Sequence, residues 1–150
     1  TNWGPGIVNT TLGNNATLQT SQNSTAVVAR GNWSTSAKAL VVQNLGSVNL
    51  TLNITSDLNE TDLITGGTAT RKRFWYNFTD RDVNACNFSS STVTNTFYNV
   101  SKTARIVCDK MQFGTGKREL WVDTYIMVPD DATQQDSAAT FTFTGSAIAD

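Results

Sequence analysis

The residues of this sequence that most clearly invite chemistry are asparagines in N-glycosylation motifs. The motif Asn-x-Ser/Thr, where x is any residue except Pro, marks an acceptor for an N-linked glycan. Random placement of the chain's 15 Asn and 36 Ser and Thr residues would give about 3.6 such motifs. The excess predicts a secreted, N-glycosylated protein. The ten acceptors are Asn9, Asn15, Asn23, Asn32, Asn49, Asn53, Asn59, Asn77, Asn87 and Asn99.

Two of these acceptors lie in a segment with the pattern of a β-strand. Between residues 47 and 55, apolar and polar residues alternate strictly, and successive side chains of a strand point to opposite faces. We therefore expect Asn49 and Asn53 to face solvent, where a glycan can be attached, while the apolar row packs in the core. The alternative is a polar strand face that matches the motif by accident.

The two cysteines, Cys86 and Cys108, offer a second kind of chemistry. In a secreted chain an even number of cysteines predicts a disulfide, which here would stabilise the fold by about 3 kcal/mol in the chain-entropy model. The alternatives are two buried thiols or half of a metal site. A structural zinc site would lack ligands, because the chain has no His and no further Cys.

Catalytic chemistry is hard to build from the remaining residues. Without His, neither a Ser-His-Asp nor a Cys-His arrangement can form. The glycine-rich turns at 66–67 and 114–116 match no phosphate-binding fingerprint, and the acids fall mostly in expected turns rather than across an aromatic cleft. Asp80 and Asp82 are weak evidence for calcium, and a solvated loop explains them better. We therefore expect no enzyme activity, no catalytic residue, no metal and no cofactor apart from N-linked glycans.

Charged residues are scarce and unclustered. They make up 15% of the chain, with a formal net charge of -1, against a typical charged share of about 25%. Because no basic stripe exists, nucleic acid is a poor candidate partner. The one basic and aromatic cluster, residues 71–76, could bind an anionic glycan or nucleic acid through cation–π contacts. The alternative places its aromatic rings in the core or an interface and its charges at a strand end.

Short β-strands are expected to position these residues. Hydrophobic residues recur mainly with a period of two, and no helical period of useful length is found. Turn residues separate the segments at 44–46, 66–67, 114–116 and 129–131. Such spacing is typical of a β-sandwich or barrel. The expected strands are 7–12, 16–20, 25–30, 37–44, 48–56, 74–79, 92–100, 104–108, 119–128 and 138–147.

The strand expected at 119–128 is apolar on both faces. Residues such as Leu120 and Val122 share one face, whereas Trp121, Tyr125 and Met127 share the other. A strand covered on both sides has this pattern, and so does a strand that exposes an aromatic contact surface.

The first twenty-odd residues differ in composition from the rest. Gly and Pro interrupt residues 1–6, and residues 7–18 carry sparse apolar residues in an extended pattern. This segment is either a flexible leader or a detachable strand that fills a groove in a neighbouring molecule. No run of 18 apolar residues predicts a membrane-spanning helix. A start at Thr1 fits a mature protein whose signal peptide has been removed, although a chain trimmed at Thr1 would begin in the same way.

Two segments resemble a known group of secreted β-sandwich proteins. Residues 38–52 look like its strand–turn–strand pattern xxVxNxGxxxxxLxL, and residues 128–132 with 138–143 look like its closing strand pair. The pattern is similar to the TasA/camelysin group and its archaeal relatives, the bundling pilins and cannula subunits. The sequon-dense composition resembles that of archaeal thread filaments. The resemblance implies an all-β, immunoglobulin-like or jelly-roll-type sandwich (residues 19–150) with an extended N-terminal donor strand (residues 1–18).

The expected function is a structural subunit of an extracellular, N-glycosylated filament, pilus-like or thread-like. The resemblance implies polymerisation by donor-strand complementation, in which the donor strand of one subunit completes the sandwich of the next. The partners would be identical subunits, with further surface contacts to other cells or filaments, and unpaired edge strands would serve as templates. The residues expected to fill the neighbour's groove are Ile7, Val8, Leu12 and Leu18.

The alternative function is a monomeric or layer-forming, glycosylated cell-surface or adhesion module. In that case Trp33, Trp75 and Trp121 would line a carbohydrate-contact surface, although three core tryptophans would explain the same residues.

Overall fold

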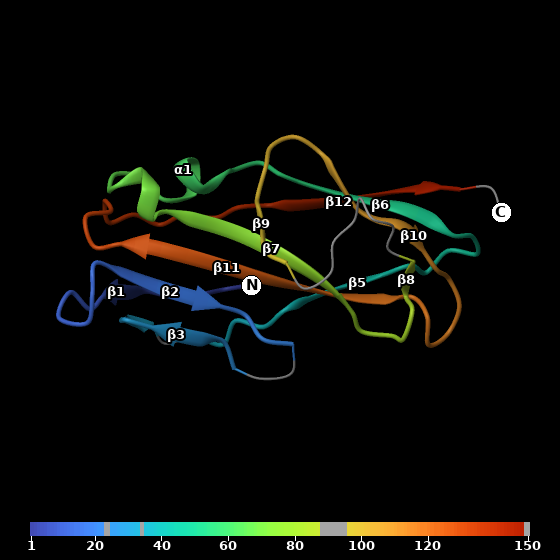
Figure 1. Cartoon of the computed structure of the whole chain (residues 1–150), viewed down its shortest axis with the longest axis horizontal. Helices are drawn as coiled ribbons and strands as arrows, with labels where there is room; N and C mark the ends of the chain where they lie inside the picture. Colours follow the sequence, from blue (N-terminus) through green and yellow to red (C-terminus); the bar gives the residue numbers. More distant parts are fainter. Residues whose placement is uncertain (23–24, 34, 88–95, 149–150) are drawn as a thin grey trace.

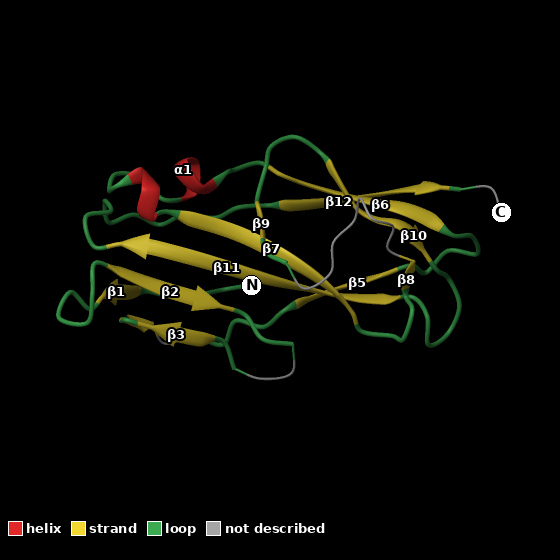
Figure 2. Cartoon of the chain, in the orientation of Figure 1, coloured by secondary structure: helices red, strands yellow, loops and turns green. Residues whose placement is uncertain are grey.

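The computed structural model describes residues 1–22, 25–33, 35–87 and 96–148, and nearly all of its regular structure is β (Figure 2). The longer strands run along the long axis of an elongated molecule (Figure 1). The strands are β1 (Gly6–Val8), β2 (Asn15–Gln19), β3 (Val27–Ala29), β4 (Gly31–Trp33), β5 (Leu40–Gln43), β6 (Leu50–Ser56), β7 (Arg73–Asp80), β8 (Cys86–Asn87), β9 (Tyr98–Asn99), β10 (Arg105–Met111), β11 (Glu119–Pro129) and β12 (Phe141–Ala147). A short helix α1 (Glu60–Leu63) and a 3-10 turn η1 (Ala69–Arg71) lie between β6 and β7.

Two antiparallel sheets form a sandwich, which confirms the predicted all-β fold. The larger sheet has the order β3-β2-β11-β7-β9, with β5 also paired to β11. The smaller has the order β12-β6-β10-β8, and β1 with β4 forms a separate two-stranded ribbon.

The core lies between the two sheets, where alternate side chains of each strand point inward. Phe74, Tyr76 and Phe78 of β7 are buried in one hydrophobic cluster with Leu52 and Ile54 of β6. Two aromatic rings of β12 pack against rings of β7, at centroid distances of 5.5 and 6.3 Å. Each such side chain stabilises the fold by about 1.5–3 kcal/mol when it leaves water. The inward residues of these strands are the alternate apolar residues of the sequence, so the period-two pattern specifies most of this core.

A disulfide closes one end of the smaller sheet. Cys86 of β8 and Cys108 of β10 are bonded, with their Cα atoms 5.9 Å apart, and both side chains are buried. That separation lies inside the usual range for disulfides, about 4.4–6.8 Å. The predicted pairing is confirmed.

Several element boundaries differ from the sequence-based expectation. The first expected strand, 7–12, shrinks to β1, because the chain turns at residues 10–12 and Gly13 then has a φ of 143°. Helix α1 was not expected, since four residues are too few to show a period. It begins at a capping box, in which Asn59 Oδ1 accepts the Asp62 N–H and Asp62 returns a bond to the Asn59 N–H. Of the strand expected at 92–100, residues 92–95 lie outside the described residues, and the structure has only β9.

No described helix has the length and apolar character needed to cross a membrane.

Candidate assembly and glycosylation sites

Strand β11 organises the larger sheet and provides the candidate assembly site. One side of β11 pairs with β7 from Leu120 to Met127. The other side is shared by two short strands, β5 opposite Glu119–Val122 and β2 opposite Tyr125–Pro129 (Figure 1). Both are antiparallel to β11 and follow one another along the same side. We call the part of this side opposite Tyr125–Pro129 the β2 seat.

The β2 seat attaches the N-terminal region (residues 1–33, β1–β4) to the two-sheet body. Ala16 and Leu18 of β2 are 0% and 2% exposed. Just after β2, the hydroxyl of Thr20 donates to Asp123 Oδ1 (3.1 Å) and accepts the Thr124 N–H (2.8 Å). These buried contacts make β2, rather than the ribbon or β3, the principal tie between the region and the body.

The four residues predicted to fill a neighbour's groove do not share one environment. Leu18 is buried in the β2 seat of its own chain, whereas Ile7 and Leu12 are 69% and 62% exposed. Val8 is half-buried in β1, which pairs with β4. The expected boundary between residues 18 and 19 falls inside β2, and Ala16, a residue of the seat, was not singled out from the sequence.

The ribbon of β1 and β4 is arranged around one tryptophan. The Trp33 ring lies against Gly6 and Gly31, where a Cβ atom would come within 2.1 and 2.3 Å of ring carbons. Glycine is therefore required at both positions. The sequence did not predict this close packing of Trp33 on Gly6 and Gly31.

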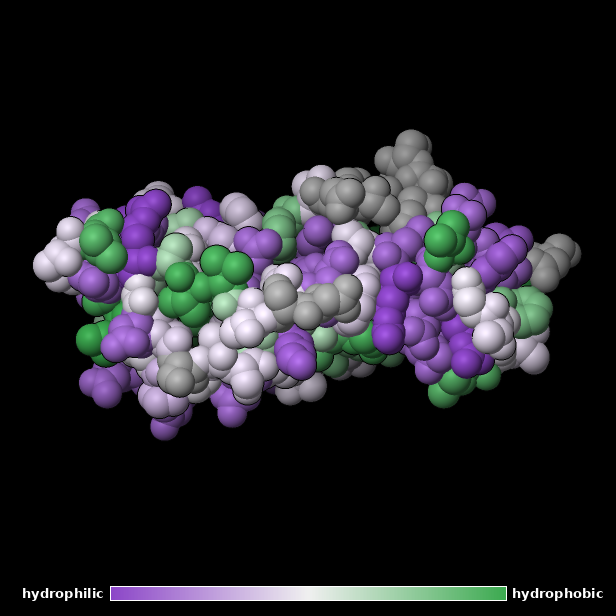
Figure 3. Space-filling model, turned by 90° about the horizontal axis from the view of Figure 1, so that it is seen from below, coloured by the Kyte–Doolittle hydropathy of each residue, from purple (hydrophilic) through white to green (hydrophobic). Residues whose placement is uncertain are grey.

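Two edge strands lack the usual protection against pairing with another chain. Among the described residues, β3 pairs only with β2, and β12 pairs only with β6. Neither 25–29 nor 137–147 contains a charged residue or Pro, which natural edges normally carry. Val27 of β3 is 60% exposed, and the face seen from below carries apolar patches within a largely polar surface (Figure 3).

The outward face of β7 and β11 carries the expected aromatic row. Trp75 stacks on Tyr125 with ring centroids 5.4 Å apart, and both are half-buried. Trp121 lies further along the same face, under the guanidinium of Arg81 at 4.7 Å. The aromatic side of β11 is therefore neither fully covered nor fully exposed. Two of the three tryptophans that could contact sugar share this face.

A buried polar pair separates those two tryptophans. Asp123 of β11 lies directly opposite Asn77 of β7, and they are 7% and 8% exposed. Burial raises the pKa of the Asp123 carboxyl, and the hydrogen bond from Thr20 offsets this in part. Asn77 Oδ1 is buried without a hydrogen-bond partner among the described residues.

The glycan acceptors divide by exposure. Asn9, Asn32, Asn87 and Asn99 are exposed, and Asn15, Asn53 and Asn59 are half-buried. Asn49 and Asn77 are each only 8% exposed. Asn23 lies outside the described residues, as do Ser34 of the Asn32 motif and residues 88–89 of the Asn87 motif.

The expectation that Asn49 faces solvent was wrong, whereas Asn53 does lie on the outward side of β6. β6 begins only at Leu50. The Asn44 side chain donates to the carbonyls of Val48 and Gln112, which draws the 44–49 turn onto the sandwich end. The alternation therefore does not extend to Asn49.

At two acceptors the motif is held by its own hydrogen bonds. The Asn9 Oδ1 accepts the Thr11 hydroxyl at 2.6 Å, and the Asn59 Oδ1 accepts the Thr61 hydroxyl at 2.8 Å. Both arrangements leave the side-chain nitrogen, the atom that a glycan modifies, outside those bonds.

The acidic residues weighed as calcium ligands are committed to the backbone. Asp80 Oδ1 accepts the Cys86 N–H and Asp82 Oδ2 accepts the Arg118 N–H, both at 3.0 Å. Burial raises the pKa of Asp80. In the described part of the chain, no three His, Cys, Asp or Glu residues come together as a metal site.

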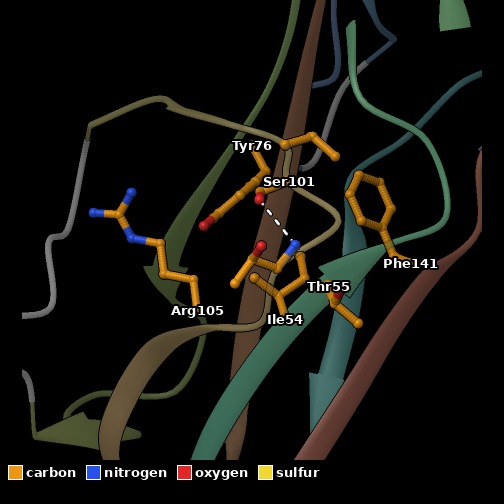
Figure 4. Close-up of a pocket in the computed structure, with 8 residues that line it drawn as sticks. Ile54, Thr55, Tyr76, Ser101, Arg105 and Phe141 are labelled. Atoms are coloured by element: carbon orange, nitrogen blue, oxygen red, sulfur yellow. Dashed lines mark hydrogen bonds between the residues drawn. The ribbon is translucent and has the colours of Figure 1, made fainter. Parts of the chain in front are cut away.

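A small pocket opens between β6, β7 and residues 100–105 (Figure 4). It is lined by residues that include Ile54, Tyr76, Arg105 and Phe141. Two further lining residues are joined by a hydrogen bond, in which the Thr103 N–H donates to Ser101 Oγ at 3.0 Å. Its volume is about 10 Å³, roughly that of one water molecule. A sugar ring or a nucleotide does not fit.

The chain matches no known family model, no curated protein and no solved structure.

Proposed function

We propose that this protein is the structural subunit of an extracellular, N-glycosylated filament assembled by donor-strand complementation. The N-terminal region of one subunit would place its β2 in the β2 seat of the next, so that each subunit completes its neighbour's larger sheet. Identical subunits are then the partners, and no catalytic step is required.

The observation that carries the proposal is the construction of the β2 seat. The chain's own β2 already fits this seat, with Ala16 and Leu18 fully enclosed. Any second copy of the chain therefore offers an identical seat to an identical strand. Exchange of β2 between subunits would reuse the contacts that β2 already makes within one chain. The chain between β4 and β5, residues 35–39, has no regular structure and provides the connection that would cross.

Other features support assembly outside the cell. The uncharged edges of β3 and β12 are templates for strand pairing. Ile7 and Leu12 expose apolar side chains that a neighbouring subunit would cover. The disulfide is typical of an oxidising compartment, and exposed acceptors such as Asn9 and Asn99 would carry glycans that limit lateral clumping.

A cysteine pair across the seat tests the proposal directly. Thr17 and Met127 are opposite each other in the β2–β11 register, on the outward side of the sheet, and directly opposed Cα atoms lie about 4.5–5.5 Å apart, within disulfide range. Assembled Thr17→Cys/Met127→Cys protein would be oxidised and run on a denaturing gel without reductant. The single variants are controls, and Thr17→Cys alone also shows the effect of losing the Asn15 motif.

We expect a ladder of covalent multimers that reduction collapses to monomer. Filaments that yield only internally bonded monomers would exclude exchange of β2. Monodisperse particles in negative-stain micrographs of the native protein would exclude the filament itself and favour the surface-module alternative.

A further inference from the structure

Among the exposed glycan acceptors, Asn99 has a distinctive neighbourhood. It lies in β9, where it is directly opposite Trp75 of β7. The Val100 N–H donates to the Phe74 carbonyl at 2.8 Å, so the adjoining Asn99–Trp75 pair falls at a non-hydrogen-bonded position. Side chains of such pairs approach most closely, with Cβ atoms about 4.5–5.5 Å apart.

Three aromatic rings surround this position on the outward face of the sheet. Trp75 stacks on Tyr125 at 5.4 Å, and Phe97, two residues before Asn99, packs on Tyr125 at 5.8 Å. All three are half-buried and so retain accessible ring surface. We call Trp75, Phe97 and Tyr125 the aromatic platform. The residues on either side of Asn99 point to the opposite face of the sheet: Tyr98 packs against Tyr76, and Val100 lies in the core.

One polar atom of the platform lacks a hydrogen-bond partner in the part of the chain that the structure describes. Trp75 Nε1 is buried and makes no hydrogen bond within the described residues. Because this atom is enclosed, the platform offers a ligand its ring surface and not this donor. Arg73 lies over the same ring, with its guanidinium carbon 5.4 Å from the ring centre.

We propose that Asn99 carries an N-glycan whose first sugars pack on the aromatic platform. A pyranose presents an apolar C–H face that suits the electron-rich face of an aromatic ring, and the half-buried rings of Trp75, Phe97 and Tyr125 supply that surface beside Asn99. The inference rests on the secreted, glycosylated character in the proposed function, but not on polymerisation.

The attachment itself is ordinary group transfer from a lipid diphosphate-linked sugar donor. Asn99 Nδ2 forms a bond to C1 of the first sugar, the bond from C1 to the diphosphate oxygen breaks, and one amide proton is lost. Asn99 meets the requirement for access, because it is exposed at the short edge strand β9.

The other acceptors in the described part of the chain do not combine these features. Asn77 also follows an aromatic residue by two positions, since Trp75 precedes it, but Asn77 is only 8% exposed. Asn9 is exposed, yet the residue two positions before it is Ile7, which is not aromatic. Asn9 therefore serves as the matched control.

The test compares thermal unfolding of glycoproteins made in a host that attaches N-glycans. Glycopeptide mass spectrometry first establishes occupancy at Asn99 and Asn9. We expect Asn99→Gln to lower Tm by about 2–4 °C, the shift that corresponds to the loss of one modest interaction in a domain of this size, and Asn9→Gln to change Tm by less than about 1 °C. Ser101→Ala, which removes the motif, should lower Tm at least as much as Asn99→Gln, because it also removes the acceptor of the Thr103 N–H. Ser101→Thr, which keeps the motif and the hydroxyl, should resemble the parent.

Two further comparisons separate the glycan from the asparagine side chain. Made in a host without N-glycosylation, Asn99→Gln and the parent should have the same Tm. In a Phe97→Ala background the Tm loss caused by Asn99→Gln should disappear, because part of the platform is gone. An unmodified Asn99, or equal Tm changes for Asn99→Gln and Asn9→Gln, would overturn the inference. Absence of filaments would leave the inference about Asn99 standing, since glycan occupancy and Tm are measured on unassembled protein.

Discussion

The two-sheet body and the N-terminal region use the same alternation of apolar and polar residues with opposite results. In the body, inward residues of β7 and β11 such as Phe78 and Leu120 are 2% exposed or less, and a disulfide ties β8 to β10. In the N-terminal region, Ile7, Leu12 and Val27 are 60% exposed or more. The body therefore has a second sheet to bury its apolar faces, whereas the N-terminal region has only β2 in its seat. A region that is attached to the body mainly through one buried strand is suited to exchange.

Three leucines sharpen this comparison and should give the largest effect. Leu120→Ala, in the closed core, should lower the free energy of unfolding by about 3–4 kcal/mol, and Leu18→Ala, in the β2 seat, by about 2–3 kcal/mol. Leu12→Ala, on an exposed turn, should change it by less than about 0.5 kcal/mol. Urea denaturation of unassembled protein measures all three. A cost at Leu12 equal to that at Leu120 would contradict the division into two regions.

The Thr20 contacts test whether hydrogen bonds help to hold the N-terminal region on the body. We call Thr20, Asp123 and Thr124 the seam between the two regions. Thr20→Val keeps the β-branched shape but removes the hydroxyl between Asp123 and the Thr124 N–H, which leaves buried groups unpaired. The expected loss is about 1–3 kcal/mol of unfolding free energy. Thr20→Ser, which keeps the hydroxyl, is the matched control and should lose clearly less. Equal losses would mean that the shape of the side chain matters and its hydrogen bonds do not.

The smallest effect is expected from the charge at the same seam. Because burial raises the pKa of Asp123 above its ordinary value of 3.8, the folded state favours the protonated carboxyl. Its contribution is fully present below pH 3.8 and is lost as pH rises through the folded pKa. The free energy of unfolding of Asp123→Asn, relative to that of the parent, should therefore be higher at pH 7 than at pH 3. Urea denaturation at both pH values measures this difference.

Asp62 provides the comparison of opposite sign. The hydrogen bond with Lys102 lowers the pKa of Asp62, so its contribution is present above pH 3.8 and is lost as pH falls. Asp62→Asn should lose stability relative to the parent between pH 3 and pH 7. The same sign for both variants would show that the seam carboxyl is not the source of the effect.

The regular parts of the fold were readable from short stretches of sequence. Period-two alternation located the strands of the body, with β11 and its aromatic outer face among the clearest, and cysteine counting gave the disulfide. The short helix α1 and the ribbon packing around Trp33 were missed. A four-residue helix has no period, and the requirement for glycine at Gly6 and Gly31 arises from a ring that folding brings against them.

The candidate sites were only partly predictable, for the same reason. Ten acceptors could be counted, but exposure is a property of what packs on each one: Asn53 is on the outward side of its strand, while Asn49 is enclosed by a turn that Asn44 holds. Leu18 was selected as an apolar anchor, but its neighbour in the seat, Ala16, is too small to attract notice.

By itself the sequence determined the strand content, the turns, the chemical classes that its composition excludes, and the only possible cysteine pairing. These depend on residue type and on spacing within a few residues, because side-chain direction along a strand is a local property of the backbone. Only the tertiary structure decided that β2 and β5 share one side of β11, and that Asn99 lies opposite Trp75. Those relations join residues that are far apart in the chain, and they exist only once the sheets have paired.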